Sequence, residues 1–145
     1  MSVGGRIILF GAVCAGLAVG IGAFGAHLLE DRISAEMLTN FETGARYHFY
    51  HSLGMLAVGI LALVKGGRAA AGAAVVDPTE AVPRDPSLNR LRWSAAAMLT
   101  GIVLFSGSLY TMALTGETWL GAVTPLGGLA LIAGWAALAW GVLRS

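Results

Sequence analysis

Residues 6–26 read RIILFGAVCAGLAVGIGAFGA, and no charged side chain follows Arg6 within this stretch. A helix rises about 1.5 Å per residue, so about 20 residues are needed to cross a hydrocarbon core about 30 Å thick. The stretch is long enough for that crossing, and it is longer than the apolar segment of a cleaved secretory signal. We therefore predict that it forms a retained transmembrane helix.

Three later stretches have the same character, at residues 46–64, 93–114 and 125–143. None carries an ionised side chain in its middle, whereas each helix of a soluble bundle would show a polar stripe. The chain of 145 residues is 57% apolar and 12% charged, with a mean hydropathy of +0.76. Such a chain has too little polar surface to cover a water-soluble domain. The sequence thus predicts an all-α membrane protein, a single domain of residues 1–145 that forms a four-helix bundle.

The connections between the spans differ in character. Residues 28–45 are predicted to form a short interfacial helix with Ser34 as its N-cap, and this helix can run on into the second span. Residues 65–92 contain prolines that disfavour helix in the residues before them, so a mobile cytoplasmic loop is expected there. Thr124 and Pro125 suit an N-cap and a first helical position for the last span.

Lysine and arginine lie mostly on one side of the predicted membrane. With four spans, the N-terminus, residues 65–92 and the C-terminus share a side, and the other side carries only Arg32 and Arg46. Because positive residues are retained in the cytoplasm, both termini are predicted to be cytoplasmic. The residues on the more positive side are Arg6, Lys65, Arg68, Arg84, Arg90, Arg92 and Arg144.

Small residues recur at regular intervals in the first and last spans. Membrane helices approach closely where small residues share a face, so both sets are predicted to pack against neighbouring helices. A lipid tail or a flat cofactor lying beside the glycines is the alternative. The small residues are Ala12, Gly16 and Gly20 in the first span and Gly127, Gly134 and Gly141 in the fourth.

Polar side chains gather near the outer ends of the spans, where ionisable groups at membrane depth are candidates for function. In the structural interpretation they only position the outer end of the bundle. The candidate cluster consists of His27, Tyr47, His51, Ser106, Ser108 and Tyr110.

Three functional hypotheses for these histidines stay open. His48 and His51 with His27 could supply metal ligands, and His27 opposite His51 could ligate a haem. A proton or small-solute pathway is the third, although the middles of the spans lack the acidic or histidine relay that such pathways need.

Motifs of catalysis are missing from the sequence. There is no Gly-x-Ser-x-Gly elbow, no phosphate-binding loop and no HExxH motif. We therefore expect no catalytic residue, metal, cofactor or nucleic-acid partner. The leading hypothesis is a non-enzymatic protein that acts through contacts with lipids or with other membrane proteins, as a homo-oligomer or an accessory subunit.

Short motifs occur in order along the chain: GAFGAH at 22–27, FxTGxxYxxxH at 41–51, SGSLY at 106–110, TPLGG at 124–128 and a Gly-Trp pair at 134–135, where x marks positions outside the motif, among them His48. Together they resemble the domain of unknown function 423 family. Its members look like small four-span membrane proteins of bacteria, and the eukaryotic transmembrane protein 256 is similar. Residues 67–88 depart from the pattern, because the family's loop is usually shorter.

The resemblance implies a four-span fold in the bacterial plasma (inner) membrane, and it carries no established activity or catalytic residue. It favours candidates that lie inside the motifs, first of all His27, His51 and the serine-rich turn at 106–108. It ranks His48 below them.

Overall fold

The computed structural model describes residues 1–73 and 86–143, and this part of the chain contains helices but no strand. Four segments are long and apolar enough to cross a membrane, so the predicted all-α fold with four spans is confirmed. In chain order the elements are α1 (Val3–Phe24), the π-helical turn η1 (Gly25–Leu29), α2 (Ala35–Ala73), α3 (Pro86–Gly101), the π-helical turn η2 (Ile102–Ser106), α4 (Gly107–Thr115), the 3-10 helix η3 (Thr118–Ala122) and α5 (Thr124–Leu143).

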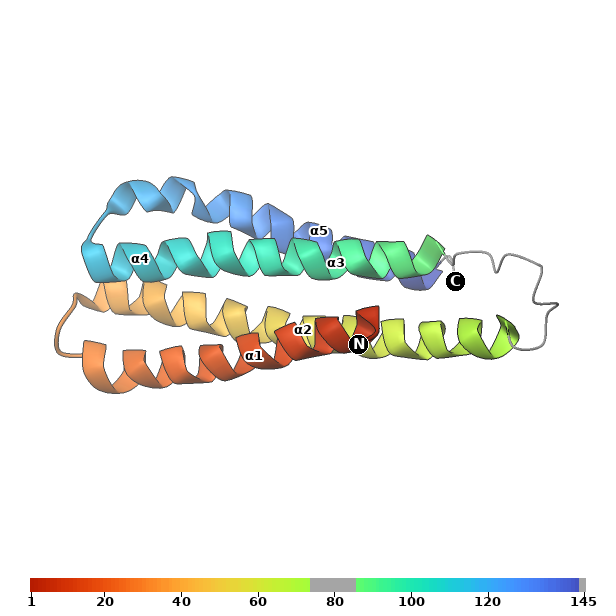
Figure 1. The fold of residues 1–145 in the computed structure, drawn as a ribbon. Helices are drawn as coiled ribbons and strands as arrows, with labels where there is room; N and C mark the ends of the chain where they lie inside the picture. Colours follow the sequence, from red (N-terminus) through yellow and green to blue (C-terminus); the bar gives the residue numbers. More distant parts are fainter. Residues whose placement is uncertain (74–85, 144–145) are drawn as a thin grey trace.

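The helices follow one another as neighbours, with α1 and α5 at opposite edges of the bundle (Figure 1). α1 packs on α2, α2 packs on α3, η2 and α4, and α5 packs on α3 and η2. The connections from η1 to α2 and from α4 to α5 lie at one end, here called the connection end. α1 and α3 begin toward the other end, where α5 finishes, and this is called the terminal end. Because α1 has little contact with α3, the bundle is open on that side.

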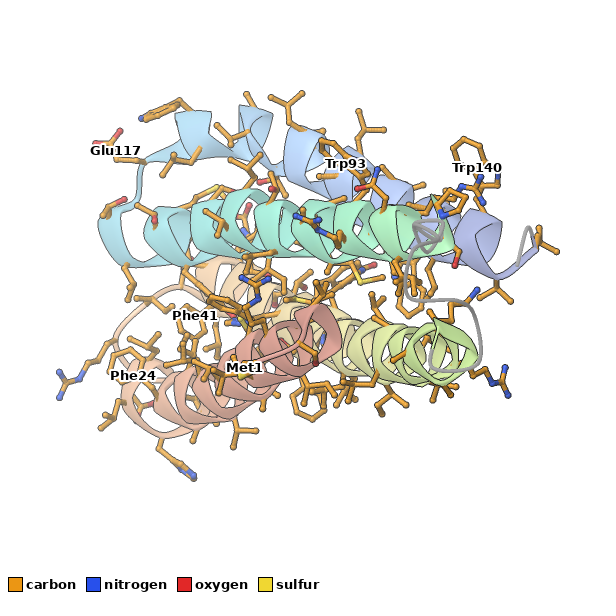
Figure 2. All side chains as sticks on the ribbon, turned by 45° about the vertical axis from the view of Figure 1, so that its right-hand side comes forward. Met1, Phe24, Phe41, Trp93, Glu117 and Trp140 are labelled. Atoms are coloured by element: carbon orange, nitrogen blue, oxygen red, sulfur yellow. The ribbon has the colours of Figure 1, made fainter. Side chains whose placement is uncertain are left out.

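The outward faces of the helices are apolar. Leu9, Val13, Ile60, Val103 and Ile132 are all more than half exposed, and Figure 2 shows side chains projecting away from every helix. In water, so large an apolar surface would drive association. Lipid tails solvate the same surface without penalty, and the helices satisfy their own backbone hydrogen bonds.

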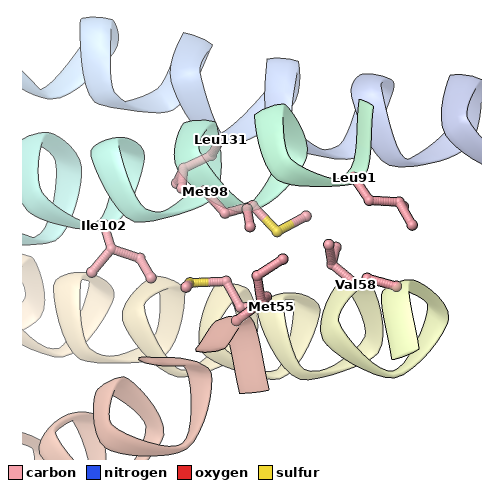
Figure 3. Packing of buried hydrophobic residues seen from close by; sticks show 9 residues of the cluster. Met55, Val58, Leu91, Met98, Ile102 and Leu131 are labelled. Carbon is pink, nitrogen blue, oxygen red and sulfur yellow. The ribbon is translucent and has the colours of Figure 1, made fainter. Parts of the chain in front are cut away.

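The main core lies between α2, α3 and α5, in the half nearer the terminal end (Figure 3). It contains the largest fully buried apolar side chains of this region, Met55 and Val58 from α2 and Leu91 and Met98 from α3. Lipid is as apolar as these side chains, so the packing contacts rather than escape from water hold the helices together. The complete cluster is Ile7, Met55, Val58, Ala62, Leu91, Ala95, Met98, Ile102 and Leu131.

Helix α2 is longer than the sequence predicted. Its 39 residues span about 58 Å, nearly twice the hydrocarbon thickness. Residues 35–45 are its first turns, so the helix predicted there runs on into the second span, and Ser34 Oγ accepts a hydrogen bond from the Met37 N–H at 3.3 Å, as expected of the N-cap. Residues 65–73 and 86–92 are helical where a loop was expected, and the rest of that expected loop, 74–85, lies outside the described residues.

The fourth span, α5, begins one residue before its predicted start at Pro125. Thr124 was predicted to be the N-cap of this helix, but it is the first residue of α5. Its hydroxyl oxygen lies 2.8 Å from Ser108 Oγ of α4. The bond joins the start of α5 to α4, so the threonine fixes the position of the last span relative to the third.

The glycines of α1 and α5 differ in what they contact. A Cβ on Gly127 would lie 2.3 Å from Phe105 N of η2, and a Cβ on Gly134 would lie 2.6 Å from Met98 Cγ of α3. These two glycines therefore let α5 approach η2 and α3. A Cβ on Gly16 or Gly20 would meet nothing within 4 Å, so these two glycines of the predicted packing face do not contact a neighbouring helix in the described part of the chain.

A different set of small residues joins α1 to α2. Gly4, Gly11, Ala18 and Gly25 are buried at intervals of seven residues. A Cβ on Gly4 would lie 2.7 Å from the carbonyl oxygen of Gly59. A seven-residue repeat keeps one seam against a partner helix at a small crossing angle, which explains why this set and not the four-residue set makes the contact.

Candidate functional site

Buried polar side chains gather between α2 and the third span, toward the connection end. His48, His51 and Ser52 come from α2, Ser106 ends η2, and Ser108 lies in α4. Each has 6% or less of its surface exposed. Such burial of polar groups at membrane depth is expensive, so the cluster is the candidate site.

A hydrogen bond between the side chains of His48 and Tyr110 joins α2 to α4. Nδ1 of His48 lies 3.3 Å from the Tyr110 hydroxyl, and the donor of this hydrogen bond depends on the imidazole tautomer. Gly44, one turn earlier on α2, makes room for the tyrosine, because a Cβ there would lie 2.9 Å from Tyr110 Cε1. Phe41 completes the setting, with its ring centroid 4.9 Å from that of Tyr110.

A hydrogen bond places one proton of the His51 ring. Its Nδ1–H donates to the carbonyl oxygen of Tyr47 at 2.7 Å. Tyr47 stacks on the imidazole at 5.9 Å between centroids, and Trp135 of α5 meets it edge-on at 6.0 Å. The ring is therefore held between α2 and α5.

Two polar atoms of this region are buried and have no hydrogen-bond partner within the described residues. They are Nε2 of His48 and Oγ of Ser106, and a third such atom in the described residues, Nη1 of Arg90, lies at the terminal end. Ser106 lies one turn before Tyr110, the residue that contacts His48, so the two atoms belong to facing elements. An unsatisfied buried polar atom costs about 1–3 kcal/mol, and a small polar molecule between facing elements would remove part of that cost.

The other predicted residues stand in different relations to this cluster. His27 is exposed in η1, whereas Tyr47 is 42% exposed and borders the cluster by stacking on His51. Ser108 Oγ bonds to Thr124, so Ser108 joins the cluster to α5. Of the six candidates, His51, Ser106 and Ser108 are buried, and Tyr110 is half-buried against His48.

The metal and haem hypotheses receive no geometric support. Within residues 1–73 and 86–143, no group of three His, Cys, Asp or Glu side chains is placed to hold a metal ion. His27 lies exposed at the end of α1, whereas His51 is buried against Trp135 of α5. The two histidines thus do not face each other across a haem-sized space.

His48 is buried and contacts Tyr110, although the motif resemblance places it below His27 and His51. The spacing of residues in the sequence indicates that His48 is buried, because the buried residues of α2 form a seam at spacings of three and four. His48 is in register with that seam and is therefore forced into the interior. The residues of the seam are Phe41, Gly44, His48, His51, Met55, Val58 and Ala62.

Two serines of the third span should respond oppositely to replacement by alanine. Ser94 Oγ donates to the Gly134 carbonyl of α5 at 2.8 Å, so Ser94→Ala should lower the free energy of unfolding by about 0.6 kcal/mol. Ser106→Ala should be neutral or stabilising, because its buried hydroxyl has no partner to lose. Reversible unfolding in mixed micelles measures both values, and an equal loss in both variants would contradict this account of the site.

Four apolar helices with lipid-facing surfaces and a polar cluster buried among them define a multi-pass α-helical membrane protein. The family described as "Protein of unknown function (DUF423)" matches residues 21–128, and the chain belongs to this family. The UPF0382 membrane protein YwdK of Bacillus subtilis is 43% identical over 128 residues, which cover 88% of each chain. No solved structure matches the chain.

Two further relatives cover nearly the whole chain. The UPF0382 membrane protein SSP2132 of Staphylococcus saprophyticus is 39% identical over 94% of this chain and 96% of its own length. The UPF0382 inner membrane protein YgdD of Escherichia coli is 32% identical over 95% of this chain and 89% of its own. These names agree with a membrane location, and none of them states an activity.

Proposed function

We propose that the protein is a non-enzymatic membrane protein that acts through the contacts of its outward faces with lipids and other membrane helices, and that it conducts nothing across the bilayer. The observation that carries the second part is the apolar core nearer the terminal end. Met55 and Val58 of α2 pack there with Leu91 and Met98 of α3, and all four are at most 2% exposed. A close-packed apolar layer separates the buried histidines from the terminal end and supports a closed bundle.

Orientation is part of the proposal. The described basic residues at the terminal end are Arg6, Lys65, Arg68, Arg90 and Arg92, whereas Arg32 and Arg46 belong to the connection end. Positive residues are retained in the cytoplasm, so we place the terminal end inside the cell and the connection end outside. A bacterial inner membrane is the location that this orientation and the relatives' names support.

Self-association is the form of protein contact that we propose. Gly16 and Gly20 leave a face of α1 unfilled, which borders an apolar groove of about 490 Å³ that reaches Phe41, Tyr110 and Leu114. Small residues exposed to lipid permit close approach of another helix. Crosslinking in native membranes should trap a second copy on α1, and recovery of monomer alone would contradict this part.

A flux measurement tests the proposal against its rival, a proton or ion pathway through the histidines. Purified protein in liposomes with a pH gradient should dissipate the gradient no faster than protein-free liposomes do. A proton ionophore added at the end gives the full signal as a control. A faster dissipation that His51→Ala abolishes, with the fold intact, would overturn the proposal and establish the pathway.

A further inference from the structure

Two hollows meet at the terminal end, on the open side of the bundle between α1 and α3. The first, of about 270 Å³, has Arg6 at one edge and is lined by apolar residues such as Ile7, Phe10 and Leu99. The second, of about 840 Å³, is lined by Asn89, Arg90, Trp93 and Trp140. Val3 and Arg92 line both hollows, so the two form one continuous groove, here called the terminal groove.

The polar part of the terminal groove is positively charged. Arg6 and Arg92 are exposed, and the guanidinium group of neither forms a hydrogen bond or an ion pair with another described residue. Arg90 is half-buried, with its guanidinium 5.0 Å above the ring of Trp140. The acidic residues that the structure describes all belong to the connection end: Glu30, Asp31, Glu36, Glu42 and Glu117.

The depth of these arginines is that of lipid headgroups. Trp93 and Trp140 are exposed toward the terminal end (Figure 2), and tryptophan favours the boundary between headgroups and acyl chains. Guanidinium groups at that depth bind phosphate through paired, charge-assisted hydrogen bonds. From Arg92 to Leu99 the floor of the groove descends about 10 Å into the apolar region, which is room for several methylene groups.

We propose that the terminal groove binds an anionic phospholipid, with its phosphate between Arg6 and Arg92 and an acyl chain along Phe10 and Leu99. The inference rests on the lipid-contact part of the proposed function and names the lipid class. A free phosphate would use the arginines and leave the apolar floor uncovered. Charge at one end and an apolar hollow at the other fit one molecule that carries both an anionic group and an acyl chain.

Native mass spectrometry of the full-length protein in detergent tests the proposal, with phosphatidylglycerol and phosphatidylcholine of identical acyl chains as probes. The wild type should bind phosphatidylglycerol at least about tenfold more tightly than phosphatidylcholine. The double variant Arg6→Gln/Arg92→Gln should lose that preference. The double variant Arg32→Gln/Arg68→Gln removes the same charge outside the groove and should keep it. Equal binding of phosphatidylglycerol to all three proteins would overturn the proposal.

A second variant separates a lipid from a phosphate ion. Ala96 is exposed and lines the apolar part of the groove, so Ala96→Phe should fill the acyl channel and weaken phosphatidylglycerol binding while every arginine remains. Ala133→Phe, on the exposed side of α5, is the matched control. Unchanged phosphatidylglycerol binding in Ala96→Phe would contradict the lipid assignment. The flux and crosslinking results do not depend on these variants, so failure here is distinguishable from failure of the proposed function.

Discussion

Lysine in place of Ile132 should destabilise the protein by about 2.5–3.5 kcal/mol or prevent insertion of the last span. Ile132 is 66% exposed in the middle of α5, where the surroundings are lipid tails. At an exposed position in water the same substitution would change stability by no more than about 0.5 kcal/mol. The measurement is the fraction of protein that inserts in cell membranes, followed by unfolding in micelles or bilayers.

Leu143→Lys is the matched control for this substitution. Leu143 is 82% exposed, and it is the last described residue of α5. A lysine there can extend its ammonium group to the interface, so insertion and stability should match the wild type. Equal tolerance of lysine at both positions would show that the exposed face of α5 is not in lipid.

Alanine in place of Gly127 should lower the free energy of unfolding by about 3 kcal/mol. The added Cβ would lie 2.3 Å from Phe105 N and 2.7 Å from Phe105 Cα. These are backbone atoms, so no side-chain rotation relieves the clash and α5 must move away from η2. Reversible unfolding in mixed micelles gives the value.

Gly128 provides the comparison for Gly127 at the adjacent position. A Cβ there would meet only the Phe105 ring, at 3.7 Å, which is an ordinary contact distance. Gly128→Ala should therefore stay within about 0.5 kcal/mol of the wild type. If both alanine variants lost the same stability, the close approach of Gly127 to the Phe105 backbone would not explain the loss, and the packing account of α5 would be wrong.

The number and type of the elements could be predicted because a bilayer imposes a length on apolar segments. The same reasoning could not locate the ends of α2, since hydropathy marks the lipid-exposed part of a helix and not its extension into water. The sequence 65–73 is helical although it continues past Lys65 into a glycine-rich stretch. Hydrogen bonding from Lys65 Nζ to Ser87 Oγ, at 3.0 Å, joins α2 to α3 in the region expected to be a loop.

The packing faces were predicted only in part, because every face of a membrane helix is apolar and hydropathy does not distinguish them. α1 carries two sets of small residues, and the set at Gly16 and Gly20 was chosen although Gly4 and Gly11 make the contact. In α5, Gly127 and Gly134 lie on the side that faces α3 and η2. The spacing alone could not tell which neighbour, if any, each set meets.

The sequence predicts the region of the candidate site, but the order in which the motifs favour its residues differs from the order of their burial in the structure. Motif resemblance favoured His27, which is exposed, over His48, which contacts Tyr110. His48 and His51 are three residues apart on α2, and both side chains point inward. The reason is that α4 covers α2 at His48, whereas α5 covers it at His51. Such coverage depends on how three helices meet, and that arrangement is not encoded in the local pattern of α2.

Thiol labelling of intact cells tests the central claim, that four crossings place both termini in the cytoplasm. In a Cys14→Ala background, single cysteines would replace Glu117 at the connection end and Asn89 at the terminal end; both positions are exposed. A membrane-impermeant maleimide should label the cysteine at 117 in intact cells and the cysteine at 89 only after the cells are opened. Labelling of position 89 from outside, or of both positions in intact cells, would contradict the account.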